Sequence, residues 1–140
     1  DIQTLDAIFS GAFRKIVQNN RELHRQHIDQ LASQVVRQIE QSYADSDLSP
    51  TRIADSLGMS SAYLGRIFRE STQTSISQYL NQTRIRRAEE LLRETEQPVE
   101  TVAGLVGFSN PKYFYVVFKN ITGQTPLQFR KAVHSASEKN

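Results

Sequence analysis

The side chains of this sequence that could form covalent bonds or hold a metal ion are few. There are three histidines and no cysteine, which excludes a cysteine nucleophile, a disulfide framework and a cysteine zinc site. His24 and His27 fit one helical face, but a metal site needs a further ligand, and the spacing of His134 and of the carboxylates supplies none. A serine nucleophile lacks a histidine and aspartate partnership, and no glycine-rich phosphate loop occurs. We therefore expect no enzyme, no metal and no cofactor.

The remaining chemistry is that of arginine and lysine, whose N–H groups bind anions. Residues 1–47 hold five Lys or Arg against seven Asp or Glu, whereas residues 48–131 hold eleven against seven. The net charge of +2 therefore conceals a basic segment. Such a bias favours a polyanionic partner, although a surplus of four charges is modest.

The basic segment is an internal repeat. Residues 54–60 (ADSLGMS) return as residues 103–109 (AGLVGFS). The similarity continues in residue pairs further along the chain, namely Tyr63-Leu64 with Tyr113-Phe114, Phe68-Arg69 with Phe118-Lys119, and Tyr79 with Phe129. The offset is 49 residues before the serine (54 to 103) and 50 after it (63 to 113). The second copy therefore carries one extra residue.

Each copy has the pattern of a helix-turn-helix. A small alanine allows close helix approach, a glycine (Gly58 or Gly107) ends the first helix in the left-handed conformation, and a serine caps the next helix. Apolar residues then recur at helical spacing along both copies. We expect recognition-type helices over about residues 60–71 and 110–121, the second opened by Asn110-Pro111.

The other elements are also predicted to be helices. An amphipathic helix is expected from residue 2 to about 20 and another from about 27 to 43, and the polar stretch between them is compatible with either a linker or a continuous helix. Capping boxes predict helix starts at Ser75, for a connecting helix to about Arg93, and at Thr125. The predicted fold class is all-α, with tandem helix-turn-helix modules (homeodomain-like helical bundles) joined by a long connecting helix, plus an extra N-terminal helix.

The start of the chain inside a helix, at Asp1, suggests a fragment of a longer protein. We expect residues 1–27 to be a helix or linker from a missing upstream sensor domain, 28–93 to be the first module with the connecting helix, 94–134 the second module, and 135–140 a disordered tail. Ile16, Leu23 and Leu31 lie near heptad spacing, so a homodimer through residues 1–43 is an alternative role for the N-terminal helices. No signal peptide or membrane-spanning run is present in the sequence.

The repeat resembles the DNA-binding region of AraC/XylS-type bacterial transcription regulators over about residues 30–131. The first module is similar in residues 53–60 and in 63–69 (YLGRIFR), the connecting helix in 84–92 (RIRRAEELL), and the second module in 106–111 (VGFSNP) and 113–126. Two modules, a connector and a terminal capping box occur in the family's order. The match is therefore specific.

The resemblance implies a seven-helix bilobed fold that places two recognition helices in successive major-groove segments of double-stranded promoter DNA. A connecting helix of roughly 18 residues is about 27 Å long, close to the roughly 34 Å between such segments. The resemblance also implies a transcription regulator, an activator that contacts RNA polymerase, in the bacterial cytoplasm and associated with the nucleoid.

Base contacts are expected from the outward side chains of the two recognition helices. These are Ser61, Ala62, Gly65 and Arg66 in the first copy, and Asn110, Lys112, Tyr115 and Val116 in the second. Arg66 is the strong reader, with guanine as its natural partner, and Ala62 suits a thymine methyl group. The family pattern has an arginine where Val116 stands, so guanine readout by the second module is in doubt.

Phosphate contacts are expected from basic side chains and from helix N-termini, which supply affinity without sequence information. The candidates are Arg52, Ser60, Arg69, Ser75, Arg84, Arg86, Ser109, Lys119, Thr125 and Lys131. One rival hypothesis is a helical module that binds protein, but its exposed positions are small or polar rather than apolar anchors. Another is a transposase or recombinase, which would leave the tandem copies and their connector unexplained.

Overall fold

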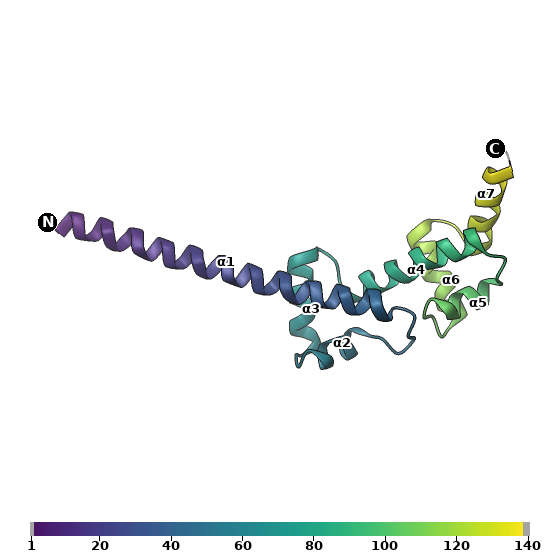
Figure 1. Cartoon of the computed structure of the whole chain (residues 1–140), viewed down its shortest axis with the longest axis horizontal. Coiled ribbons are helices and arrows are strands. Elements are labelled where there is room, and N and C mark those ends of the chain that lie inside the picture. The colour runs from purple at the N-terminus through teal and green to yellow at the C-terminus, as the bar shows by residue number, and fades with distance from the viewer. Residues whose placement is uncertain (1, 139–140) are drawn as a thin grey trace.

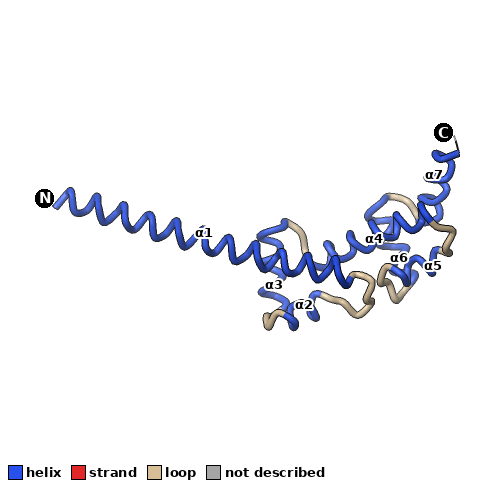
Figure 2. Tube along the Cα trace, viewed as in Figure 1, coloured by secondary structure: helices blue, strands red, loops and turns tan. Residues whose placement is uncertain are grey.

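The computed structural model describes residues 2–138, which form seven α-helices and no strand (Figure 2). The helices are α1 (Ile2–Ser42), α2 (Pro50–Ser56), α3 (Ser61–Thr72), α4 (Ile76–Glu94), α5 (Val99–Leu105), α6 (Pro111–Thr122) and α7 (Pro126–Glu138). The predicted all-α class with two joined helix-turn-helix modules is confirmed. Within the described range, no helix combines the length and the apolar character needed to cross a membrane.

Helix α1 is continuous over 41 residues, so the two helices considered at the N-terminus are one. The polar stretch between them, from Asn19 to Gln26, contains no proline or glycine that would break the helix. The N-terminal part of α1 projects away from the other helices, while its C-terminal part lies beside α3 (Figure 1). The extra N-terminal helix of the prediction is therefore an extension of the first module's own helix.

The first module packs α2, α3 and the start of α4 against the C-terminal half of α1. Its main cluster of buried apolar side chains is Ala32, Val35, Ile39, Ile53, Ala54, Leu64, Phe68, Ile76 and Leu80, and a smaller cluster comprises Ile28, Leu31 and Ile67. Ser49 begins α2 by accepting a hydrogen bond from the backbone N of Arg52 (3.2 Å), with Pro50 at the first helical position. Serine is a favoured N-cap residue, and proline is tolerated at the first helical position because its missing N–H would have no helical partner there.

The second module repeats this arrangement around the C-terminal half of α4. Its buried side chains are Ile85, Ala88, Leu92, Val99, Val102, Ala103, Val106, Phe108, Phe114, Val117 and Phe118. Apolar positions related by the repeat are buried in both modules, as the pairs Ala54 with Ala103 and Phe68 with Phe118 show. The sequence repeat is therefore also a repeat of side-chain packing.

Helix α4 belongs to both modules. Ile76 and Leu80 lie in the first core, and Ile85, Ala88 and Leu92 lie in the second. Because the two cores share one rigid element of 19 residues, the orientation of one module constrains the other.

The C-terminal helix extends further than predicted. A disordered tail is predicted over 135–140, but α7 remains helical to Glu138. Residues 1, 139 and 140, which belong to the predicted N-terminal segment and tail, lie outside the described residues. The tail prediction is therefore wrong for residues 135–138, where helical hydrogen bonding continues without an apolar pattern.

The C-terminal caps of α3 and α6 occupy equivalent positions in the repeat but are different residues. Gly123 ends α6 at φ +80°, whereas Gln73 ends α3 at φ +65°. Left-handed backbone is strained for residues with a Cβ, and Gln73 offsets part of this through its side-chain hydrogen bond to the carbonyl of Glu70 (3.2 Å).

We expect Gln73→Gly to raise the free energy of unfolding by about 0.5–1 kcal/mol, because relief of strain exceeds the lost surface hydrogen bond and the added chain entropy. Urea unfolding followed by circular dichroism measures the change. The reciprocal substitution, Gly123→Gln, should destabilise the chain. Destabilisation by Gln73→Gly would show that the hydrogen bond to Glu70 outweighs the strain.

Candidate nucleic-acid interface

Helix α3 is the first of the two predicted recognition-type helices, called reading helices below, and α6 is the second. A glycine turn and a serine cap position α3. Gly58 adopts φ +67°, and the Ser60 side chain accepts a hydrogen bond from the backbone N of Tyr63 (3.2 Å). The face made by Leu64, Ile67 and Phe68 is buried. The opposite face of α3 is therefore presented to solvent, as the spacing predicts.

The exposed face of α3 carries one long basic side chain near its middle. Ser61, Ala62 and Arg66 are exposed, and an added Cβ at Gly65 would meet nothing within 4 Å. The Arg66 guanidinium lies over the Tyr63 ring, 5.4 Å from its centroid. Stacking on a neighbouring ring limits the side chain's freedom while leaving its N–H groups accessible. Arg66 is thus a partly ordered hydrogen-bond donor on a helix face whose other residues are small.

The second reading helix, α6, begins one residue later than the corresponding helix of the first copy. The Asn110 side chain accepts a hydrogen bond from the backbone N of Lys112 (3.0 Å), and Pro111 occupies the first helical position. Ser109 is exposed and lies one residue before the cap. The extra residue of the second copy therefore moves the cap from serine to asparagine.

The exposed face of α6 is less charged than that of α3. Lys112 is exposed, and Val116, at the position equivalent to Arg66, is 56% exposed. Tyr113 is 50% exposed and accepts a hydrogen bond from the Asn81 side chain of α4 (3.2 Å). The repeat pairs Tyr113 with Tyr63 but does not reveal this contact between α6 and α4.

Tyr115 is less exposed than Lys112 and Val116, which departs from the outward position expected from the helical spacing. It is half-buried, packs against the second core and lies edge-on to Phe114, with ring centroids 6.1 Å apart. Desolvation, and secondarily the charge and hydrogen bond of Glu100 on α5, raise the pKa of the Tyr115 hydroxyl. The hydroxyl group is directed towards Glu100 of α5, and the side chain lies about 100° around the helix from Val116.

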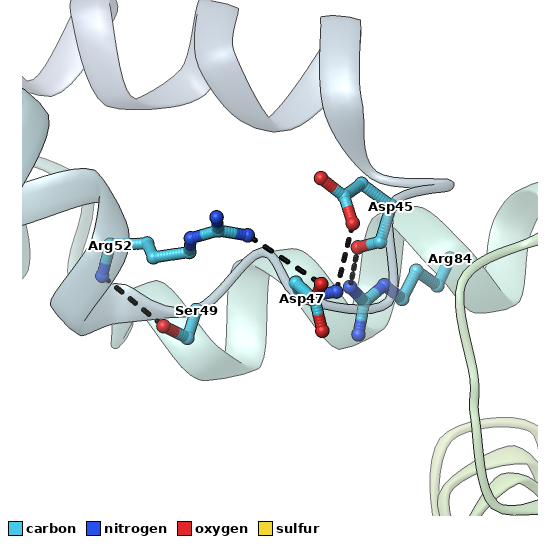
Figure 3. Close-up of polar contacts among 5 residues, drawn as sticks. All are labelled: Asp45, Asp47, Ser49, Arg52 and Arg84. Atoms are coloured by element: carbon cyan, nitrogen blue, oxygen red, sulfur yellow. Dashed lines mark hydrogen bonds and ion pairs between the residues drawn. The ribbon is translucent and has the colours of Figure 1, made fainter.

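Arg84 is buried, so its prediction as a phosphate contact is wrong. Only 6% of the residue is exposed. Its Nε donates to the carbonyl of Tyr43 (2.8 Å) and its Nη2 donates to the carbonyl of Asp45 (2.9 Å), as Figure 3 shows for Asp45. The guanidinium also lies over the Phe108 ring, 5.5 Å from its centroid. Arg84 thus joins the α1–α2 loop of the first module to the α5–α6 turn of the second.

Burial of this charge shifts its pKa. Desolvation lowers the pKa of the Arg84 guanidinium, and the charge of Asp45 partly opposes the shift. Two backbone carbonyls, a carboxylate and an aromatic face surround the cation and keep it hydrogen-bonded. Its role is structural, because both carbonyl partners occupy N–H groups that a phosphate would need.

A second arginine, Arg130 on α7, makes a similar bridge that sequence reasoning missed. Its Nε donates to the carbonyl of Leu92 (3.1 Å) and its Nη2 donates to the carbonyl of Thr95 (3.3 Å) at the end of α4. Each arginine thus supplies donors to a helix C-terminus and the following loop, where carbonyls lack helical partners. A basic residue type alone does not distinguish this role from phosphate binding.

The other basic candidates remain at the surface. Arg52, Arg69, Arg86, Lys119 and Lys131 are all exposed. Arg52 lies 3.8 Å from Asp47, with both side chains largely exposed (Figure 3). Such a pair is weak and open to exchange for another anion. Arg69 and Lys119 lie in the last turns of α3 and α6, at positions that the repeat relates.

The helices that follow the reading helices have capped starts. Thr125 and Gln128 form the full reciprocal capping box, with hydrogen bonds of 3.2 Å and 3.0 Å. Ser75 accepts from the backbone N of Gln78 (3.1 Å), but the Gln78 side chain is bonded to Thr74 instead of returning to Ser75. The box is thus complete at Thr125 and half-formed at Ser75.

Two capped helix-turn-helix units, each with a buried apolar face and an exposed reading face, define a DNA-binding helix-turn-helix protein. The family described as a helix-turn-helix domain matches residues 53–132. The chain therefore belongs to the AraC-type family of DNA-binding domains of transcription regulators, and is not an enzyme. The resemblance found in the sequence is confirmed.

Relatives of known name support this assignment. The Msm operon regulatory protein of Streptococcus mutans is 37% identical over 100 residues, covering 71% of this chain and 36% of that protein. The arabinose operon regulatory protein of Escherichia coli is 32% identical over 117 residues, covering 84% of this chain and 40% of that protein. The chain therefore spans little more than a third of the length of these relatives.

Solved structures show the same architecture. The C-terminal domain of AraT, a response regulator from Geobacillus stearothermophilus, matches with a TM-score of 0.71 and 30% identity, covering 73% of this chain and 84% of that domain. The DNA-binding domain of AdpA, in complex with a target DNA, matches with a TM-score of 0.71 and 25% identity, covering 78% of this chain and 97% of that domain.

Proposed function

We propose that this chain binds double-stranded promoter DNA by inserting α3 and α6 into successive segments of the major groove. The observation that carries the proposal is that both helices expose the same repeat-related face while α4 belongs to both cores. At 19 residues, α4 is about 28 Å long, compared with roughly 34 Å for one turn of DNA. The structurally similar AdpA domain was solved in complex with a target DNA, which supports DNA binding by this fold.

The two modules are proposed to read bases by different means. On α3, Arg66 donates to guanine O6 and N7, while Ser61, Ala62 and Gly65 allow close approach to the groove. On α6, Val116 contacts a thymine methyl group, while Asn110 and Lys112 reach base edges or nearby phosphates. The first box is therefore expected to be more sharply defined than the second.

Phosphate contacts are proposed for the exposed basic side chains and the capped helix starts. The set comprises Arg52, Arg69, Arg86, Lys119 and Lys131, with the helix starts at Ser60, Ser75 and Thr125 and with Ser109, which lies one residue before the α6 cap. Helix N-termini present free N–H groups to anions. Arg84 is excluded from the set because its donors are bonded to backbone carbonyls.

The role of the whole protein is proposed from the relatives. We place residues 1–27 as the link to an upstream sensor domain, 28–93 as the first module and 94–134 as the second. The protein acts as an activator that contacts RNA polymerase in the cytoplasm, associated with the nucleoid, as a homodimer through residues 1–43. A relative named as a transcriptional activator, RhaR of Cronobacter sakazakii, is 43% identical over 68 residues.

Arg66→Ala is expected to lower the affinity for the best operator by on the order of 10- to 100-fold, because one bidentate guanine contact is lost. The measurement selects bound sequences from a random duplex pool at fixed salt and then determines binding constants. The wild-type chain should recover two boxes about one helical turn apart. The variant should lose information in one box only.

Two further variants serve as controls for this experiment. Arg14→Ala, on the projecting part of α1, should leave the selected motif unchanged. Arg69→Ala should weaken binding to all sequences alike and reduce the slope of affinity against salt by about one. Recovery of no motif by the wild-type chain would contradict specific DNA recognition and favour a protein-binding module.

A further inference from the structure

The N-terminal part of α1 carries an apolar surface with no other element against it. From Thr4 to His27 every side chain is exposed except Val17, which is half-buried. This segment, which we call the stem, projects away from the two modules (Figure 1). Its large apolar side chains are strongly exposed, at 79% for Phe9 and 62% for Leu23. A contiguous apolar surface of this kind marks an interaction site.

The spacing of these side chains has the period of a coiled coil. Phe9, Ile16 and Leu23 are seven residues apart, and Leu5 precedes Phe9 by four. In heptad notation the first three occupy a positions, and the d positions are Leu5, Ala12, Asn19 and Gln26. The outer b, c and f positions of the stem hold only small or polar residues apart from Val17. The apolar stripe is therefore as narrow as the seam between two helices.

The flanking residues favour a second copy of the same helix in parallel orientation. In that arrangement each g residue faces the e residue five positions further along the partner. The pairs are Ile8 with Phe13, Lys15 with Asn20, and Glu22 with His27. None of them places like charges together. The pair at one end is apolar, and the pair at the other end joins a carboxylate to an imidazole.

The seam residues lead to the same orientation. A parallel pair stacks each apolar residue on its own copy and leaves two polar layers, Asn19 on Asn19 and, at the end of the stem, Gln26 on Gln26. A buried asparagine layer fixes the register of coiled coils. An antiparallel pair centred on the same stripe would set Phe9 against Asn19, which buries an amide beside an aromatic ring. The parallel pair therefore leaves fewer buried polar mismatches.

The size of the stripe suits a stable dimer. The four phenylalanines of a pair can bury on the order of 600 Å². The paired Leu5, Ile8, Ile16 and Leu23 side chains bring the interface to roughly the 1,200–2,000 Å² of stable protein interfaces.

The stripe and the module use different faces of α1. At 100° per residue, the buried face of Ile28, Val35 and Ile39 is rotated from the stripe by roughly 130°. The next two a positions, Gln30 and Arg37, are polar and exposed, so the seam ends where the module begins. A partner can therefore occupy the stripe without displacing α3 from α1.

We infer that the stem forms a parallel two-stranded coiled coil with a second copy of this chain, in the register that places Phe9, Ile16 and Leu23 on their own copies. This deepens the dimer included in the proposed function and rests on it. Because α1 is uninterrupted, the coil and the first helix of each module move as one body. The coil would thus hold two pairs of reading helices at a fixed relative orientation.

The absence of cysteine from the chain permits a direct test. Single-cysteine variants of the 140-residue chain are oxidised at low micromolar concentration, and the fraction of disulfide-linked dimer is measured. Leu23→Cys lies in the seam and Arg21→Cys on the opposite face, so the first is expected to link at least tenfold faster than the second. Self-linkage at position 23, near one end of the stem, requires the parallel orientation.

Two outcomes would overturn the inference. One is equal linkage at positions 21 and 23 together with a monomeric mass for the unsubstituted chain by sedimentation equilibrium. The other is preferential linkage between Leu5→Cys and Leu23→Cys chains in a mixture, which would show antiparallel pairing. Ile16→Glu should give monomers that still select the same two-box motif. Loss of dimers is thereby distinguished from loss of DNA recognition, which the selection experiment tests separately.

Discussion

Gly107→Ala is expected to destabilise the chain by roughly 3 kcal/mol, because the residue has φ +103° and no room for a side chain. An added Cβ would overlap the carbonyl oxygen of Tyr43 and lie 2.8 Å from Nε of Arg84. The first of these atoms is backbone, so the clash cannot be relieved by a rotamer change. The α5–α6 turn would have to separate from the α1–α2 loop.

Urea or thermal unfolding of the purified chain measures this effect. Gly104→Ala, three residues earlier in α5, is the matched control, because an added Cβ there meets nothing within 4 Å. Alanine within a helix should stabilise the chain by about 0.5–1 kcal/mol relative to glycine. The same substitution is thus expected to have opposite signs at two nearby positions. Equal effects would show that the close approach of Gly107 to Tyr43 is absent in solution.

Arg84→Met is expected to destabilise the chain by about 2 kcal/mol, because the Tyr43 carbonyl loses the hydrogen bond from Arg84 and the Asp45 carbonyl keeps only the one from the backbone N of Leu48. Methionine keeps most of the side chain's length and apolar contacts, so the loss reports mainly on hydrogen bonding. Arg84→Lys should retain part of the stability, since one ammonium group cannot reproduce the two-carbonyl geometry of a guanidinium.

The Arg84→Met substitution should also affect the preference for two correctly spaced DNA boxes, apart from its effect on the free energy of unfolding. Under conditions where the variant remains folded, we expect its affinity for an isolated single box to match the wild type and its affinity for two correctly spaced boxes to fall. Arg86→Met, exposed on the same helix, is the control for stability and should unfold as the wild type does. An unchanged preference for two-box spacing in Arg84→Met would contradict its role in holding the two modules together.

Much of the fold could be predicted because its signals are local. The glycine turns at Gly58 and Gly107, the caps at Ser49 and Ser60 and the apolar faces of α3 and α6 depend on residues within a few positions of each other. The repeat strengthened these predictions, since each signal occurs twice in the same order. The exposed position of Arg66 followed from helical spacing alone.

Other features depended on contacts between distant residues. Arg84 and Arg86 are the same residue type two positions apart, yet one is buried and the other exposed. The difference arises because one helical face meets the α1–α2 loop. Tyr115 has neighbours similar to those of Val116, but its ring meets the second core and its hydroxyl meets Glu100 on α5. Pattern analysis placed both Arg84 and Tyr115 at the DNA surface.

The sequence by itself determined the helices, their caps, the two-module repeat and the family, because these are encoded by short-range spacing. The tertiary structure decided that α1 is a single helix with a projecting stem, and that Arg84 and Arg130 bridge backbone carbonyls. The physical reason is that burial of a charged or aromatic side chain is set by whichever element packs against it. For Arg84, that element is the α1–α2 loop, where Tyr43 lies about 40 residues away in sequence.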